Sequence, residues 1–197
     1  MVTPVHADVV DLYRGVDAET PATQGWLYAG TGEASQSAVE GITTLTTMAG
    51  NGAQVGYSLW PVAPLIKRDT GYTIIVEMRL ELEEHASNHR AGFSLIVLSD
   101  GDSDGIELGF WTDRIWAQES GFTQAEMVLY DTSTAVNRYA LTVLEDSYYL
   151  LVNGRQILTG PLRNYAASVT YPYALKNFLF MGDDTSSARA RVSITAV

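Results

Sequence analysis

Short stretches in which apolar and polar residues alternate recur along the whole chain. No window of eleven or more residues repeats apolar residues with the spacing of a helix. Side chains on a strand point alternately to its two faces, so each alternating stretch predicts a strand with one apolar face. The clearest is 73–82, whose two sets are Val76, Met78, Leu80 and Leu82, and Glu77, Arg79 and Glu81.

About a dozen further strands are expected at short intervals between clusters of Gly, Asn and Asp. The pair Asn153-Gly154 supplies the positive φ angles of a tight hairpin turn between two of them. No internal repeat of fixed period is present, which argues against propellers and solenoids. The chain is therefore predicted to be all-β, with two antiparallel sheets packed as a sandwich. The expected strands are 9–14, 42–47, 54–59, 93–98, 106–111, 114–118, 126–130, 139–144, 148–152, 156–158, 178–181 and 190–194.

The domain organisation is predicted to be simple. The 197 residues contain no linker rich in Pro, Gly or Ser, so we expect one domain over 8–197. Residues 5–7 form a Val-x-Ala pattern of the kind that closes a signal peptide. We therefore expect 1–7 to be either the remnant of such a signal or a disordered start.

The composition excludes several classes of partner and chemistry. The net charge of -11 repels phosphate backbones and anionic lipid surfaces, so neither nucleic acid nor a membrane is an expected partner. No stretch approaches the roughly 18 apolar residues of a membrane-spanning helix. The chain has no Cys, which removes disulfides, thiolate nucleophiles and thiolate-bound zinc. The oligomeric state does not follow from the sequence.

The C-terminal half carries a resemblance to a known superfamily. The segments 139–143 and 148–160 look like the paired "Y-x-L-x-V" and "L-x-V-N-G" strands of laminin-G domains and other concanavalin A-like lectin and glucanase domains. Segment 178–188, with the strand after it, is similar to their last turn and strand. The resemblance implies a jelly-roll β-sandwich. It covers the N-terminal third only weakly.

A closer resemblance is to a group of exported bacterial, especially cyanobacterial, domains. These share a "G-I-E-L-G-F-W" strand like 105–111 and a "G-D-D-T-S-S-A" turn like 182–188. The resemblance implies a secreted or periplasmic protein. The group has no established activity, and the superfamily holds lectins, glycoside hydrolases, polysaccharide lyases and adhesion modules. Membership therefore does not choose a function.

Three predicted strands place polar and aromatic residues on one parity. If these strands are neighbours, one sheet has a polar face with tryptophans, which suits sugars because indole stacks on a pyranose while polar groups bind its hydroxyls. The alternative is a solvated outer face with half-buried tryptophans. A bulge would reverse the parity of everything after it. The candidate ligand-binding residues are Arg79, Glu107, Trp111, Arg114, Trp116 and Gln118.

The sequence gives only weak evidence of catalytic motifs. Glu107 with Glu77, or with Asp113, could supply the paired carboxylates of a glycosidase. However, no segment matches the E-x-D-x-x-E strand of the superfamily's laminarinase-type hydrolases or the motifs of its alginate lyases. His85 and His89 lie in a predicted loop, where exposed histidines are expected rather than a metal pair. No nucleophile elbow, P-loop or dinucleotide motif is present.

Three functions remain. We expect a secreted carbohydrate-binding or adhesion module without catalysis. The alternatives are a hydrolase or lyase acting on polysaccharide through the same polar face, and an extracellular structural domain that associates with itself. Two carboxylates about 5–10 Å apart in a cleft would favour hydrolysis. An exposed apolar patch would favour association.

The only cofactor suggested is calcium. The run 100–105 matches the first half of a D-x-D-x-D-G calcium loop, in which Asp100, Asp102 and Asp104 would converge on the ion. The second half of the motif fails, because Trp111 stands where a bidentate Glu is required. The alternative is an acidic hairpin turn.

If calcium binds here, it raises the melting temperature, because a ligand of the folded state alone stabilises that state. Asp102→Ala should abolish the shift. The check is a thermal melt with calcium and with a chelator, and equal curves for the unaltered protein would remove the site.

Overall fold

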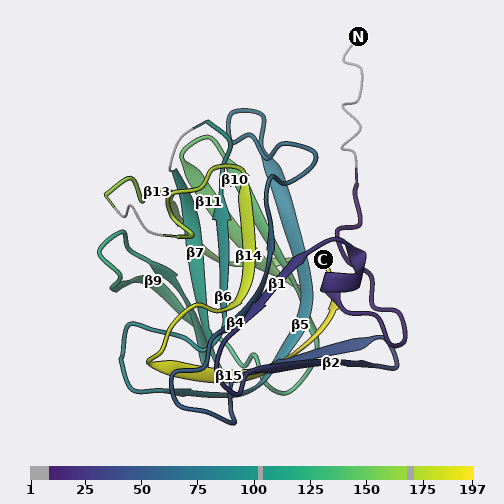
Figure 1. Cartoon of the computed structure of the whole chain (residues 1–197). Helices are drawn as coiled ribbons and strands as arrows, with labels where there is room; N and C mark the ends of the chain where they lie inside the picture. The colour runs from purple at the N-terminus through teal and green to yellow at the C-terminus, as the bar shows by residue number, and fades with distance from the viewer. Residues whose placement is uncertain (1–8, 102–103, 168–170) are drawn as a thin grey trace.

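Two antiparallel sheets pack face to face in the computed structural model, which describes residues 9–101, 104–167 and 171–197 (Figure 1). The larger sheet has eight strands in the order β1-β4-β14-β6-β7-β8-β9, and the short β13 pairs with β7. Its strands are β1 (Leu27–Gly30), β4 (Val55–Leu59), β6 (Ser94–Leu98), β7 (Asp104–Trp111), β8 (Arg114–Gln118), β9 (Gln124–Leu129), β13 (Arg163–Asn164) and β14 (Phe178–Asp183).

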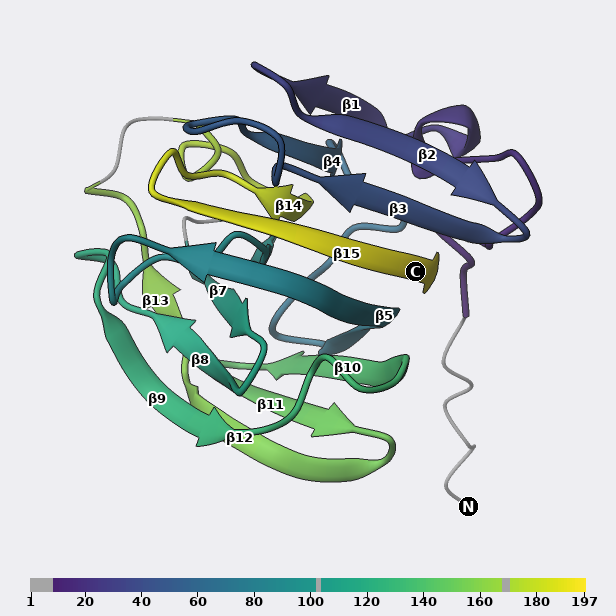
Figure 2. The same cartoon turned by 90° about the horizontal axis from the view of Figure 1, so that it is seen from below.

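The smaller sheet has seven strands in the order β12-β11-β10-β5-β15-β3-β2, which can be followed in Figure 2. In the described residues the only helical element is a short 3-10 turn, η1 (Pro21–Gln24), and no helix is long and apolar enough to cross a membrane. The prediction of an all-β, two-sheet sandwich is confirmed. The strands of this sheet are β2 (Ser35–Val39), β3 (Ile42–Thr46), β5 (Tyr72–His85), β10 (Asn137–Leu144), β11 (Ser147–Val152), β12 (Arg155–Pro161) and β15 (Ala188–Ala196).

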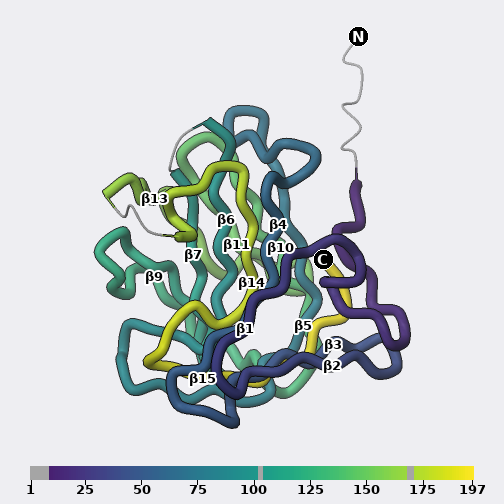
Figure 3. The backbone as a smooth tube through the Cα atoms, in the orientation of Figure 1, coloured from purple at the N-terminus to yellow at the C-terminus, as the bar shows by residue number. Residues whose placement is uncertain are grey.

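The N-terminal part departs from the prediction. Residues 9–14 do not form the expected strand: Leu12 and Tyr13 bond through their N–H groups to the carbonyl of Val197, and Arg14 forms an isolated bridge. The beginning of the described chain thus lies beside its end (Figure 3). Strands β1 and β2 were not predicted, because neither alternates clearly between apolar and polar residues.

The alternation in β5 holds only up to a bulge. Val76, Met78 and Leu80 are buried between the sheets as predicted. The pairing of β5 with β15 then slips, because Leu80 lies opposite Val192 and Leu82 opposite Arg191. Beyond this bulge Leu82 is 45% exposed, whereas the Glu83 side chain is 2% exposed. The expectation that Leu82 faces the core is therefore wrong, for the parity reversal that a bulge produces.

The central strands of the eight-stranded sheet are buried on both faces. Its inner face, which includes Leu95, Leu108 and Phe110, packs against the other sheet. Its outer face is covered by Tyr165 and Tyr173, which lie in the connection from β13 to β14. Burial on both faces explains why β6 and β14 are apolar almost throughout.

A glycine in β7 makes room for an aromatic ring on the outer face. Gly109 lies opposite Trp116 of β8, and a Cβ built at Gly109 would lie 2.5 Å from an atom of that indole. Trp116 is fully buried, so its ring has no space into which to move. The close approach of the ring to the strand therefore requires Gly109.

We expect Gly109→Ala to lower the free energy of unfolding by about 1–3 kcal/mol, because overpacking a buried site forces side chains and backbone to shift. Gly121→Ala is the matched control, since no atom lies within 4 Å of a Cβ built at Gly121. Urea denaturation measures the free energy of unfolding of both variants. Equal stability of the two variants would contradict the packing of Trp116 on Gly109.

Candidate functional site

The structure separates the three strands that were expected to share one polar face. β7 and β8 are neighbours, but β5 lies in the other sheet between β10 and β15. Glu77 therefore lies near Arg138, at 3.5 Å, and Arg79 bonds to Glu81 at 2.8 Å. The predictions that Arg79 joins the β7–β8 face and that Glu77 pairs with Glu107 are both wrong, because the strands belong to different layers.

On β7 and β8 the predicted parity is confirmed. Ile106, Leu108, Phe110, Ile115 and Ala117 all belong to the core between the sheets. The candidate ligand-binding residues of these two strands lie on the opposite face, which is covered by loops. Exposed fractions there are 0% for Trp116, 1% for Glu107, 1% for Gln118 and 6% for Trp111.

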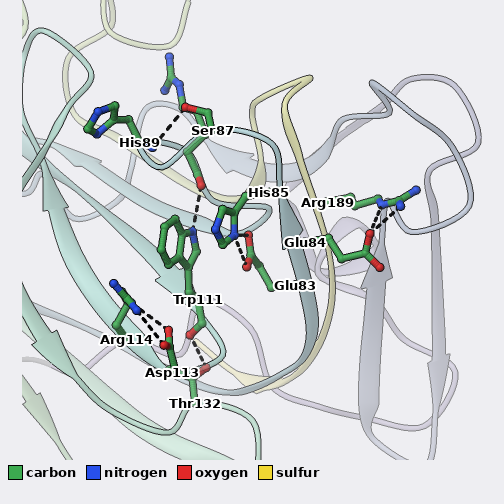
Figure 4. A network of polar contacts seen from close by, with 11 residues as sticks. Glu83, Glu84, His85, Ser87, His89, Trp111, Asp113, Arg114, Thr132 and Arg189 are labelled. Carbon is green, nitrogen blue, oxygen red and sulfur yellow. Dashed lines mark hydrogen bonds and ion pairs between the residues drawn. The ribbon is translucent and has the colours of Figure 1, made fainter.

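Trp111 is enclosed by other side chains. The ring of His85 stacks on it, with centroids 3.6 Å apart and planes 5° from parallel (Figure 4). Its Nε1–H donates to the carbonyl of Arg90 at 2.9 Å, and the Arg114 guanidinium lies 5.0 Å from the ring centroid. Trp116 packs edge-on against it. Protein groups thus occupy the faces on which sugar stacking was predicted.

A buried acidic cluster lies on the same outer face of the sheet. Ser94 Oγ donates to Glu107 Oε1 at 3.0 Å, and the Tyr173 hydroxyl bonds to Glu107 Oε2. The same hydroxyl lies 3.3 Å from Asp184 Oδ2. The Glu107 N–H donates to the hydroxyl of Tyr165 at 3.2 Å. Since both carboxyl groups are one hydrogen-bond length from one phenol oxygen, they lie within about 6 Å of each other.

Burial and proximity alter the acidity of both groups. Burial first, and the nearby charge of Asp184 second, raise the pKa of Glu107 well above its ordinary value. Burial also raises the pKa of Asp184, while the positive charge of Arg90 acts in the opposite direction on both carboxyls. The Tyr173 hydroxyl lies between Glu107 and Asp184 but can donate its single proton to only one of them. If one of the two carboxyls keeps its own proton near neutral pH, both contacts with the hydroxyl can be hydrogen bonds.

Asp183, the last residue of β14, is a third buried carboxyl. Thr47 Oγ1 donates to its Oδ2 at 2.7 Å, and the Thr185 N–H donates to its Oδ1 at 3.1 Å. Burial raises the pKa of Asp183 to about 8. Asp184 and Tyr173 were missed by the sequence reasoning, although Asp184 lies in the 182–188 turn on which the resemblance rested.

A polar groove lies open to solvent at the end of β5, where β15 begins. It has a volume of about 340 Å³, within the usual range for small-ligand sites. Arg189 Nε donates to Glu84 Oε2 at 2.9 Å, and Arg189 Nη1 donates to Asn51 Oδ1 at 3.3 Å. Figure 4 shows this ion pair beside the His85–Trp111 stack. The groove is lined by Asn51, Gly52, Glu84, His85, Ala86, Ser186, Ser187, Ala188 and Arg189.

The predicted calcium loop is described only in part, because Asp102 lies outside the described residues, as do residues 1–7. Asp104 Oδ1 accepts a hydrogen bond from Asn164 at 2.6 Å, and its Oδ2 lies 3.3 Å from Arg68. The Asp100 N–H donates to the carbonyl of Ile66. Within the described residues no group of three His, Asp or Glu side chains is arranged to hold a metal ion. Calcium remains a prediction.

Comparison with known proteins identifies the fold. No protein-family model matches the chain, and no curated protein matches it in sequence. A carbohydrate esterase from the Shiga toxin-encoding bacteriophage phi24B aligns with a TM-score of 0.65 and 13% identity, over 96% of this chain and 97% of that one. A Bacillus subtilis protein of unknown function with a galectin-like fold aligns with a TM-score of 0.56 and 13% identity, over 97% of this chain and 98% of that one.

A sialidase aligns with a TM-score of 0.54 and 12% identity, over 89% of this chain and 17% of the sialidase. At these identities the likeness shows the fold alone. The chain is therefore an antiparallel jelly-roll β-sandwich.

The buried carboxyls predict an unusual dependence of stability on pH. A carboxyl whose pKa is higher in the folded chain than in the unfolded chain favours folding at low pH and loses that contribution as the pH rises. The free energy of unfolding should therefore fall as the pH increases from about 4.5 toward 8.

Glu107→Gln should make this fall smaller, because the amide cannot ionise. Glu33→Gln, at an exposed carboxylate, should leave the fall unchanged. Chemical denaturation at a series of pH values measures this decrease in the free energy of unfolding. The acidic cluster would have no such effect if both variants followed the pH profile of the unaltered protein.

Proposed function

We propose that this domain binds carbohydrate, without catalysis, in the polar groove at the ends of β5 and β15. The observation that carries the proposal is the set of side chains around that groove. Arg189 and Asn51 offer N–H donors, Ser186 and Ser187 offer hydroxyls, and Glu84 offers acceptor oxygens. Neighbouring sugar hydroxyls need donors and acceptors placed side by side, and charged groups make the stronger bonds.

The charges favour a neutral sugar. Arg189 already has a carboxylate partner in Glu84, so the groove has little net charge to attract an anion. The chain as a whole carries a net charge of -11, which opposes anionic polysaccharides. The ring of His85, backed by Trp111, adds a flat surface at one side of the groove.

The similar structures support a carbohydrate-related role. One is named a carbohydrate esterase, another a sialidase, and a third is described as galectin-like. We also propose that the domain acts outside the cytoplasm, in keeping with the absence of Cys and the resemblance to exported domains.

Hydrolysis is the second candidate, and one observation favours it. Glu107 and Asp184 lie within about 6 Å of each other, close to the separation of the carboxyls in retaining glycosidases. Against it, Glu107 is almost inaccessible beneath Tyr165 and Tyr173. A buried carboxyl cannot approach a glycosidic bond, so we place binding before catalysis.

A glycan array with the purified domain tests the proposal first. For a neutral glycan that binds, Arg189→Ala should weaken affinity at least tenfold, because it removes the charged donor of the groove. Arg191→Ala, two residues further along the same strand, is the control. Both variants should melt like the unaltered protein, since an exposed ion pair contributes only about 0–1 kcal/mol.

Absence of any bound glycan, or equal affinity of the Arg189→Ala and Arg191→Ala variants, would contradict the proposed site. Chromatography of an oligosaccharide after incubation decides between binding and hydrolysis. Cleavage that disappears in Glu107→Gln would establish the second candidate instead.

A further inference from the structure

One edge of β5 lacks a neighbouring strand over its first residues. On one side β10 pairs with β5 from Met78 back to Tyr72. On the other side the pairing with β15 ends at Glu77, which lies opposite Ala196. Within the described residues no strand continues this pairing along 72–76.

The backbone direction identifies which groups face the open edge. Successive residues of a strand direct their N–H and C=O groups to opposite neighbours. The Arg138 carbonyl accepts from the Asn153 N–H on the β11 side of β10, so the adjacent Tyr139 bonds toward β5, where its partner is Val76. The even-numbered residues of this part of β5 therefore face β10.

The odd-numbered residues then face the other way. In agreement, the carbonyl of Glu77 accepts a hydrogen bond from Thr195 of β15. Thr73 and Ile75 have the same parity as Glu77 and lie beyond the end of that pairing. Their N–H and C=O groups are directed to the open edge, where no described strand receives them.

An apolar groove of about 640 Å³ follows this edge. Val10 and Leu65 are exposed at its sides, and Leu144 is exposed at the end nearest Tyr72. Large apolar side chains rarely gather at the surface unless something covers them. The charged side chains that line the groove are Asp11, Glu77 and Arg138.

We propose that this groove binds an extended segment of another polypeptide, which adds to β5 as a strand beside Thr73 and Ile75. Strand addition supplies partners for the directed backbone groups, and apolar side chains of the segment fill the groove. The stretch 72–76 accommodates about five residues, or about 17 Å of strand. Glu77 is paired with Arg138 and Asp11 with Arg14, so the groove itself has little net charge, but the chain as a whole carries -11, so the segment carries basic flanking residues. This inference is independent of carbohydrate binding.

The probe is an acetylated, fluorescein-labelled peptide, Val-Thr-Val-Thr-Val followed by two lysines, with binding followed by fluorescence polarisation. Two further peptides carry N-methyl groups on alternate amides, either the even or the odd positions. A strand uses only one of the two sets toward its neighbour. One methylated peptide should therefore lose at least tenfold in affinity while the other binds nearly as well as the parent.

Variants of the protein test the same edge. Thr73→Pro removes one N–H that faces the groove and leaves the bonds to β10, which the even-numbered residues make, in place. It should weaken peptide binding about tenfold. Thr73→Ala removes the γ-methyl group and the hydroxyl that bonds to Thr142 but keeps the backbone N–H, so it should bind like the unaltered protein.

The proposal is overturned if the parent peptide does not bind. It is equally overturned if both methylated peptides bind as tightly as the parent, which would indicate nonspecific apolar contact. Equal binding by folded Thr73→Pro and Thr73→Ala would also overturn it. Should Thr73→Pro fail to fold, the methylated peptides decide the matter alone.

Discussion

Water is largely excluded from the outer face of the central strands of the eight-stranded sheet, and the properties of the polar groups buried there follow from that. Tyr165 and Tyr173 cover the face, so the carboxyl of Glu107 must find its partners within the protein. Ser94 and Tyr173 provide them, while the Tyr165 hydroxyl accepts from the backbone N–H of Glu107. The same exclusion of water raises the pKa of Glu107 and encloses the tryptophans that, on an open sheet, would bind ligand.

The loop from Asp183 to Ala188 joins this interior to the surface. Asp183 and Asp184 belong to buried polar networks, whereas Ser186 and Ser187 line the open groove. The buried bonds of the two aspartates fix one end of the loop. Thr185 extends this constraint toward the surface, because its N–H bonds to Asp183 and its hydroxyl bonds to Ser187.

Alternation along the chain was sufficient to predict most of the strands from β3 onward, the two-sheet architecture, and the parity of β7 and β8. It was insufficient for pairings between distant segments, because the chain order does not show that β15 inserts between β5 and β3. Arg79 was wrongly grouped with the residues of β7 and β8 for this reason, because its strand, β5, belongs to the other sheet. The partners of Glu107 escaped prediction for a related reason: Ser94, Tyr173 and Asp184 come from three separate segments, and only the folded chain brings them together.

The bulge in β5 divides the strand into two parts that direct different kinds of side chain toward the protein interior. Up to Leu80 the strand contributes apolar side chains to the core, and after the slip its next inward side chain is the carboxylate of Glu83, which bonds to His85. The ring of His85 in turn covers Trp111. One extra residue thus converts the far end of a structural strand into part of a polar surface. Indels at this point would exchange one face of the strand for the other, whereas substitutions would not, so the length of β5 restricts this region more tightly than the identity of any one side chain in it.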